Sequence, residues 1–187
     1  MQANRMRRLH IVGHKNHGKT SLILDLICEF RLRGFRVGVI KHTSHRHEID
    51  VPGKDSHRQR TAGASPVAIL SDGLQAVFST ILGPVDEEAR YRSLAATFAD
   101  CDLVIVEGHV ATAGPKLEVW RSDRGIPPMA CNNDSILAVV TDSSDSVELA
   151  QPVLSRSNIA EIADWIAYRV GLGGPSAADL GGPRTEN

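Results

Sequence analysis

The stretch GHKNHGKTS, residues 13–21, constrains the fold of this chain more than any other feature. It matches the pattern G-x-x-x-x-G-K-[ST], with the fixed positions filled by Gly13, Gly18, Lys19 and Thr20. The short apolar run Leu9–Val12 precedes it and predicts a buried strand. Apolar residues at helical spacing follow it over residues 22–30, so a helix is expected there. A tight turn from strand to helix is therefore the first structural prediction.

Such a turn is suited to binding phosphate. Glycine at positions 13 and 18 permits backbone angles that other residues resist, so the loop N–H groups can converge on an anion. The helix N-terminus adds free N–H donors, Lys19 would reach the β- and γ-phosphates, and the Thr20 hydroxyl would ligate Mg²⁺. The alternative is an ordinary glycine turn, which the matching strand and helix disfavour. The predicted phosphate-binding residues are Gly13, His14, Lys15, Asn16, His17, Gly18, Lys19, Thr20 and Ser21. Within this set, we expect the Lys15 side chain to face solvent.

The remaining apolar runs predict an α/β domain. A second strand at residues 37–40 completes a strand–helix–strand unit, which is typical of parallel sheets. Further strands are expected at residues 67–70, 76–79, 103–106, 117–120 and 136–140, and further helices at residues 87–98 and 158–170. The polar region 41–63 has no periodicity and is interpreted as a long functional loop. We expect one domain over residues 1–170, with a mostly parallel sheet and helices on both faces, and a flexible tail over residues 171–187.

Composition excludes several classes of partner. Lys and Arg number 21 and Asp and Glu 22, so the formal net charge of −1 gives no reason to expect nucleic acid or an anionic membrane. Neither a signal core nor a membrane span is visible. The three cysteines are far apart and odd in number, which favours reduced thiols and a cytoplasmic location.

Two carboxylates are candidates for the metal side of the site. Glu107 directly follows the most strand-like run, 103–106, and ligands of open parallel sheets bind at such strand ends. Asp50 follows the second strand, although an ordinary loop aspartate beside Pro52-Gly53 is the alternative. Thr20, Asp50 and Glu107 are thus the predicted Mg²⁺ ligands. Asp142, after the strand at 136–140, is interpreted as a turn residue.

The polar loop after the second strand carries other candidates. Lys41, Arg58 and Arg60 are predicted contacts to phosphate or another anionic substrate, with a solvated helix face as the alternative for the two arginines. His42, His45 and His47 are close enough in sequence to share a transition metal. No cysteine or carboxylate spacing accompanies these histidines, so a polar loop is the preferred interpretation.

The chain from about residue 8 to 170 resembles the molybdopterin-guanine dinucleotide biosynthesis adapter family (MobB). Three stretches beyond the phosphate loop carry the resemblance, and the first is the most specific: KHTSHRHEIDVPGKDSHRQRTAGA, DLVIVEGH and GPKLEVWR. Six loop positions match the family: Gly13, Asn16, Gly18, Lys19, Thr20 and Ser21. Asp50 and Glu107 match its acidic positions. Two residues depart from it, His17 where a small Ser is usual and His109 where Phe is common.

The resemblance implies a three-layer P-loop NTPase fold, a homodimer, and GTP binding with Mg²⁺ and weak hydrolysis. It also implies a partner guanylyltransferase that joins GMP to molybdopterin. No N-K-x-D motif is present, so the guanine preference rests on the resemblance alone. Two alternatives stay open. One is a self-sufficient ATP-dependent ligase or kinase resembling dethiobiotin synthetase, and the other is a metal-delivery GTPase.

Overall fold

The computed structural model describes residues 6–43, 48–81, 83–84, 86–143 and 148–173. The chain divides into two compact units, one made of residues 1–43 and 94–187 and the other of residues 44–93. Most of the predicted C-terminal tail, residues 174–187, lies outside the described part. Each unit is taken in turn below.

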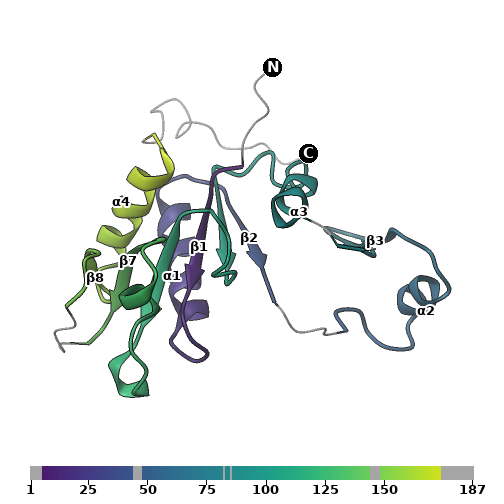
Figure 1. Cartoon of the computed structure of the whole chain (residues 1–187). Helices are drawn as coiled ribbons and strands as arrows, with labels where there is room; N and C mark the ends of the chain where they lie inside the picture. Colours follow the sequence, from purple (N-terminus) through teal and green to yellow (C-terminus); the bar gives the residue numbers. More distant parts are fainter. Residues whose placement is uncertain (1–5, 44–47, 82, 85, 144–147, 174–187) are drawn as a thin grey trace. The chain divides into compact units, whose positions relative to one another are not determined.

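The first unit is built on a parallel sheet of six strands (Figure 1). In sheet order the strands are β2 (Val37–Lys41), β5 (Leu103–Glu107), β1 (Arg8–Val12), β6 (Lys116–Trp120), β7 (Ile136–Thr141) and β8 (Val153–Ser155). All five pairings between neighbouring strands are parallel. The predicted α/β class is confirmed, and β8, three residues long, is a strand that the sequence pattern did not predict.

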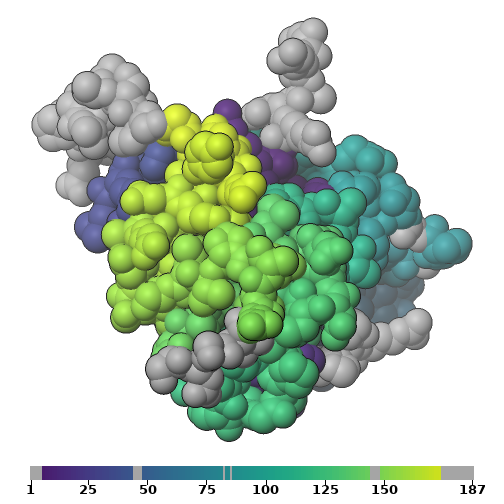
Figure 2. All heavy atoms as spheres, turned by 60° about the vertical axis from the view of Figure 1, so that its left-hand side comes forward, coloured from purple at the N-terminus to yellow at the C-terminus, as the bar shows by residue number. Residues whose placement is uncertain are grey.

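Two long helices cover one face of this sheet. Leu9 and Ile11 of β1 pack with the buried face of α1 (Lys19–Leu32) and with that of α4 (Ile159–Val170) in one apolar core. Figure 2 shows α4, in yellow, beside the blue-purple surface of α1. Asn158 caps the N-terminus of α4, because its side chain accepts the Glu161 N–H.

The opposite face of the sheet carries a smaller apolar cluster. Val12, Trp120 and Val139 pack there against Ala130 of the 3₁₀ helix η2 (Met129–Asn132). A second 3₁₀ helix, η1 (Ser122–Arg124), follows β6. Among the described residues, no helix is long and apolar enough to cross a membrane.

The second unit contains an antiparallel hairpin and two short helices. Strands β3 (Val67–Ser71) and β4 (Leu74–Phe78) pair with each other, and α3 spans Glu87–Ser93. The prediction of a loop without secondary structure over 41–63 is wrong, because α2 occupies Asp55–Thr61. None of the residues of α2 is buried, so its sequence shows no apolar periodicity. The helix predicted over 87–98 ends earlier, at Ser93.

Candidate functional site

The phosphate loop leaves β1 and enters α1, as predicted, and its glycines have backbone angles that other residues rarely adopt. Gly13 has φ of 140°, and a Cβ atom there would lie 2.4 Å from the Val119 carbonyl oxygen. Gly18 has φ of 92° and is the N-cap residue, directly before the first residue of α1. Asn16 also has a positive φ, of 66°. The loop is therefore wound tightly and lies directly against β6.

Lys19 is folded over this loop. Its Nζ donates to the carbonyl oxygens of Gly13 at 2.9 Å and of His14 at 2.8 Å. Burial lowers the pKa of Lys19, the nearby Glu107 carboxylate raises it, and Lys41 lowers it further. The first turn of α1 contains no acidic residue. The ammonium group and the free N–H groups of the helix start thus present positive charge at one place, which is what an anion requires.

The sheet brings a carboxylate to the same place. The Thr20 hydroxyl donates to Oε1 of Glu107 at 2.9 Å. Glu107 ends β5 and is in register with Lys41 at the end of β2, and its carbonyl accepts the N–H of His42 at 3.0 Å. A hydroxyl beside a carboxylate offers the oxygen ligands that Mg²⁺ prefers. Lys19, Thr20, Lys41 and Glu107 form the candidate site of the first unit.

The other loop residues differ in exposure. Lys15 is exposed, which confirms that it faces solvent, and Asn16 and Ser21 are exposed as well. His14 is half-buried. His17 is the exception, because it is 1% exposed and its Nδ1 accepts the backbone N–H of Arg121 at 3.2 Å. The predicted phosphate-binding set thus contains one side chain that packs inward.

The predicted histidine cluster lies only partly in the described residues. His45 and His47 fall outside them. His42 stacks face to face on His109, with ring centroids 4.1 Å apart and planes at 7°. His109 in turn meets the edge of His10, at 5.9 Å. His109 has φ of 66°, so the turn after β5 is held in a left-handed conformation that aims this ring at His42.

His10 is a titratable residue whose burial the sequence did not reveal. It lies in the middle of β1, is fully buried, and contacts the Gly108 carbonyl through Nδ1 at 3.3 Å. The Arg8 side chain donates to its Nε2 at 3.2 Å. Burial lowers the pKa of His10 to about 4, an effect that the bond to Gly108 partly offsets. A histidine inside an apolar strand run is the signal that could have indicated a buried, neutral ring.

Two further buried charges lie in β6. Glu118 is fully buried, and its carboxylate accepts the N–H groups of Met129 at 2.8 Å and Ala130 at 2.9 Å, which fixes the start of η2. Burial raises the pKa of Glu118. Lys116 is 1% exposed, its Nζ donates to the Ser135 hydroxyl at 3.0 Å, and burial lowers its pKa. Charges inside the run KLEVW were the signal that could have identified both. Asp142, by contrast, is exposed, as expected of a turn residue.

In the second unit, Asp50 is buried and only half satisfied. Its Oδ1 accepts the Val51 N–H at 2.8 Å and the Ser56 hydroxyl at 3.0 Å. Its Oδ2 is buried and has no hydrogen-bond partner among the described residues. A carboxylate oxygen left in this state suits a cation as its missing partner. Asp50 belongs to the second unit, whereas Thr20 and Glu107 belong to the first.

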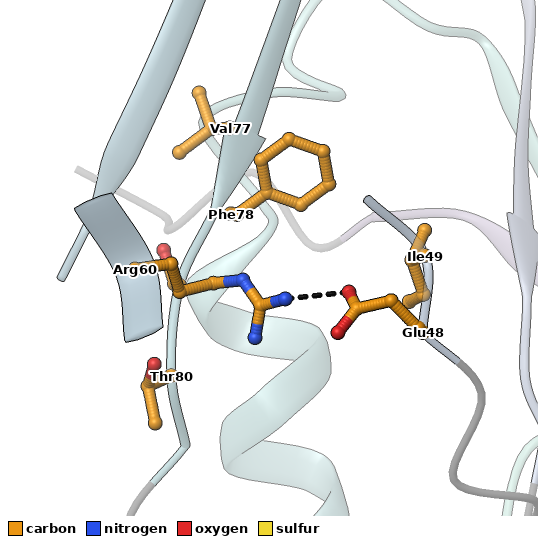
Figure 3. Close-up of a pocket in the computed structure, with 7 residues that line it drawn as sticks. Glu48, Ile49, Arg60, Val77, Phe78 and Thr80 are labelled. Carbon is orange, nitrogen blue, oxygen red and sulfur yellow. Dashed lines mark hydrogen bonds and ion pairs between the residues drawn. The ribbon is translucent and has the colours of Figure 1, made fainter. Parts of the chain in front are cut away.

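The two predicted arginines of the second unit differ. Arg58 is exposed, and its Nη1 lies 3.9 Å from Oδ1 of Asp55. Arg60 is half-buried and forms an ion pair with Glu48, beside a cavity of about 530 Å³ that Val77, Phe78 and Thr80 also line (Figure 3). Both arginines therefore already have a carboxylate partner, and an anionic ligand would compete with it.

The chain is similar to known proteins of one family. The family model described as Molybdopterin guanine dinucleotide synthesis protein B matches residues 8–142. A molybdopterin-guanine dinucleotide biosynthesis adapter protein of Haemophilus influenzae is 34% identical over 163 residues, which cover 87% of this chain and 89% of that protein. The corresponding Escherichia coli protein is 32% identical over 152 residues, covering 80% and 85%.

Solved structures agree with this family relationship. A crystal structure of a MobB protein homologue from Bacillus stearothermophilus has a TM-score of 0.63 at 26% identity and covers 90% of this chain and 100% of that one. A crystal structure of a molybdopterin-guanine biosynthesis protein B has a TM-score of 0.62 at 28% identity, with coverage of 88% and 99%.

Proposed function

Because the chain belongs to the molybdopterin guanine dinucleotide synthesis protein B family, we propose that it is a GTP-binding adapter that assists the attachment of GMP to molybdopterin. The observation that carries the proposal is the geometry of Lys19, Thr20 and Glu107 around the phosphate loop. Backbone N–H groups and an ammonium would bind the phosphates. The partners that we propose are a molybdenum cofactor guanylyltransferase and molybdopterin.

Mg²⁺ is the metal that we propose for this site. Thr20 and Glu107 would hold it from the first unit, and it would neutralise charge on the phosphates. Asp50 of the second unit, whose buried Oδ2 lacks a partner among the described residues, is proposed separately as a Mg²⁺ ligand. Lys41, in register with Glu107, is the proposed contact to the terminal phosphate, and Arg58 and Arg60 are proposed contacts to an anionic substrate.

We propose that hydrolysis by the isolated protein is weak. Phosphoryl transfer depends on holding the attacking water in line, which requires an acceptor in a fixed position. Within the first unit, the Glu107 carboxylate beside the loop is already bonded to Thr20. The adapter would therefore act in a complex, and we expect it to be a homodimer. The free thiols of Cys28, Cys101 and Cys131 favour action in the reducing cytoplasm.

A self-sufficient phosphoryl-transfer enzyme is the second candidate. Lys41 favours it, because an ammonium at the end of β2 and in register with Glu107 can stabilise a transferred phosphoryl group. GTP and ATP turnover by the isolated protein, and then with the guanylyltransferase and molybdopterin, separates the two. The adapter predicts slow turnover alone and a higher yield of the dinucleotide cofactor in the complex. Rapid turnover alone, without an effect on that yield, would support the enzyme instead.

A further inference from the structure

His17 connects the phosphate loop to the far end of β6. Its Nδ1 accepts the N–H of Arg121, a residue 104 positions later in the chain. The ring is buried, at 1% exposure, in a loop whose neighbouring residues Lys15 and Asn16 are exposed. Its Nε2 is also buried and makes no hydrogen bond within the described residues. The bond to Arg121 is thus the polar interaction that orients this ring.

The same bond determines the protonation state of the ring. An N–H donor can bond to Nδ1 only if Nδ1 carries a lone pair, so the proton of the neutral imidazole is on Nε2. If Nδ1 were protonated, its N–H and the N–H of Arg121 would face each other, and neither group could accept the bond. Burial lowers the pKa of His17, and the surrounding cations lower it further, which favours the neutral form. The His14 ring lies beside the His17 ring, and among the described residues Lys19 and Arg124 act on it as cations and Asp123 as an acid.

A second contact to β6 lies at the start of the same loop. The backbone of Gly13 approaches the Val119 carbonyl so closely that a Cβ atom there would lie 2.4 Å from the oxygen. The backbone of Gly13 lies against the Val119 carbonyl, and the His17 ring accepts the N–H of Arg121, so both ends of the loop segment 14–16 contact the C-terminal end of β6 or the residue after it. A loop held in this way has its N–H groups aligned before the ligand arrives, which lowers the entropic cost of binding.

We propose that His17 is a positioning residue for nucleotide binding. Its neutral imidazole, by accepting the Arg121 N–H, holds the phosphate loop against the end of β6, and tight triphosphate binding depends on this bond. The inference rests on the proposed GTP binding, which it extends to the buried side chain of a loop residue.

Two variants separate the hydrogen bond from the shape of the ring. His17→Asn places Oδ1 where Nδ1 lies and keeps the acceptor, whereas His17→Phe keeps the ring and removes it. Titration calorimetry with a non-hydrolysable GTP analogue and Mg²⁺ should find about 10-fold weaker binding for His17→Phe, the size expected when a buried N–H loses its acceptor. His17→Asn should stay within about 3-fold of the wild type. Equal losses in both variants, or none in His17→Phe, would overturn the proposal.

A pH series adds a readout that a purely structural role would not change. Wild-type affinity should decrease relative to that of His17→Asn as the pH falls from 6.5 toward the lowered pKa of His17. The comparison of the two proteins cancels the titration of the nucleotide itself. Parallel pH profiles would count against the proposal.

Hydrogen exchange tests the same bond without a nucleotide. The Arg121 amide should exchange about 10-fold faster in His17→Phe than in the wild type, and His17→Asn should restore its protection. Unchanged exchange in folded His17→Phe would show that the bond does not hold the loop. Because this measurement needs no GTP, it is independent of the proposed function. A wild type that binds no nucleotide would refute that function while leaving the Arg121 amide as the test of the loop.

Discussion

The Thr20 hydroxyl donates to the Glu107 carboxylate across 2.9 Å, although 87 positions separate the two residues in the chain. The contact forms because β1 and β5 are parallel neighbours, with Ile11 in register with Glu107. The ends of two parallel strands that lie far apart in the sequence therefore meet at one edge of the sheet. This is the place where a phosphate and its metal would share ligands.

Replacement of Glu107 by Gln should impair Mg²⁺-dependent GTP hydrolysis more than GTP binding. The amide can still accept from Thr20, but it loses the negative charge that a divalent cation requires. We expect hydrolysis to fall by at least about 10-fold and binding to change by less than about 3-fold. Steady-state phosphate release across a Mg²⁺ titration measures the first, and calorimetry the second.

The matched control for Glu107→Gln is Glu148→Gln, because Glu148 is an exposed glutamate of the first unit that has no part in the proposed site. Wild-type hydrolysis with an unchanged Mg²⁺ dependence in Glu107→Gln would remove this residue from the metal side of the site.

Replacement of Lys19 by Ala should weaken triphosphate binding by about 10- to 100-fold, the range for a lost charge-assisted hydrogen bond. The fold should persist, since the hydrogen bonds of Nζ go to the loop carbonyls of Gly13 and His14. Lys15→Ala is the control, because Lys15 belongs to the same loop but is exposed. Calorimetry with a GTP analogue reports binding, and circular dichroism reports the fold. If Lys19→Ala and the wild type bound the GTP analogue with equal affinity, residues 13–21 would not be a phosphate-binding loop.

Replacement of Asp50 by Asn tests whether the buried oxygen without a partner serves a cation. Asn keeps an oxygen to accept from Val51 and Ser56, so stability should change by less than about 1 kcal/mol. If Asp50 ligates Mg²⁺, the Mg²⁺ concentration for half-maximal hydrolysis should rise severalfold. Ser56→Ala is the control, since it removes a bond to Oδ1 without removing the charge. If the Mg²⁺ concentration for half-maximal hydrolysis changed in Ser56→Ala but not in Asp50→Asn, Asp50 would not be a Mg²⁺ ligand.

The stability of the fold should decrease at acidic pH because of His10. Its folded-state pKa, about 4, lies below the usual 6.5, so the unfolded chain binds the extra proton first. The contribution of His10 to the free energy of unfolding is complete above pH 6.5. It is lost as the pH falls toward 4, a decrease of about 3 kcal/mol. Urea unfolding at a series of pH values measures this slope. His10→Asn should be less stable at pH 7 but should show a flatter profile between pH 6.5 and 4, and an equally steep profile would exclude His10 as the cause.

The local elements of this protein could be predicted from its sequence because their signals are local. The phosphate-loop pattern spans eight consecutive residues, and the apolar runs at 103–106 and 136–140 indicate strands wherever they occur. The cap at Asn158 is equally local, since its partner Glu161 is three positions away. In α2 this signal is missing, because a helix with no buried face has no apolar periodicity.

The arrangement of the site was decided only by the tertiary structure. The neighbours of β1 are β5 and β6, strands that come much later in the chain, and no local pattern specifies that order. Sequence reasoning could nominate Glu107 as an acid at a strand end, but the strand order made it the partner of Thr20. The same order placed Arg121 beside His17 and thereby converted a polar loop residue into a buried acceptor. Local sequence determined which elements form, and the burial of apolar faces in one sheet determined which of their ends meet.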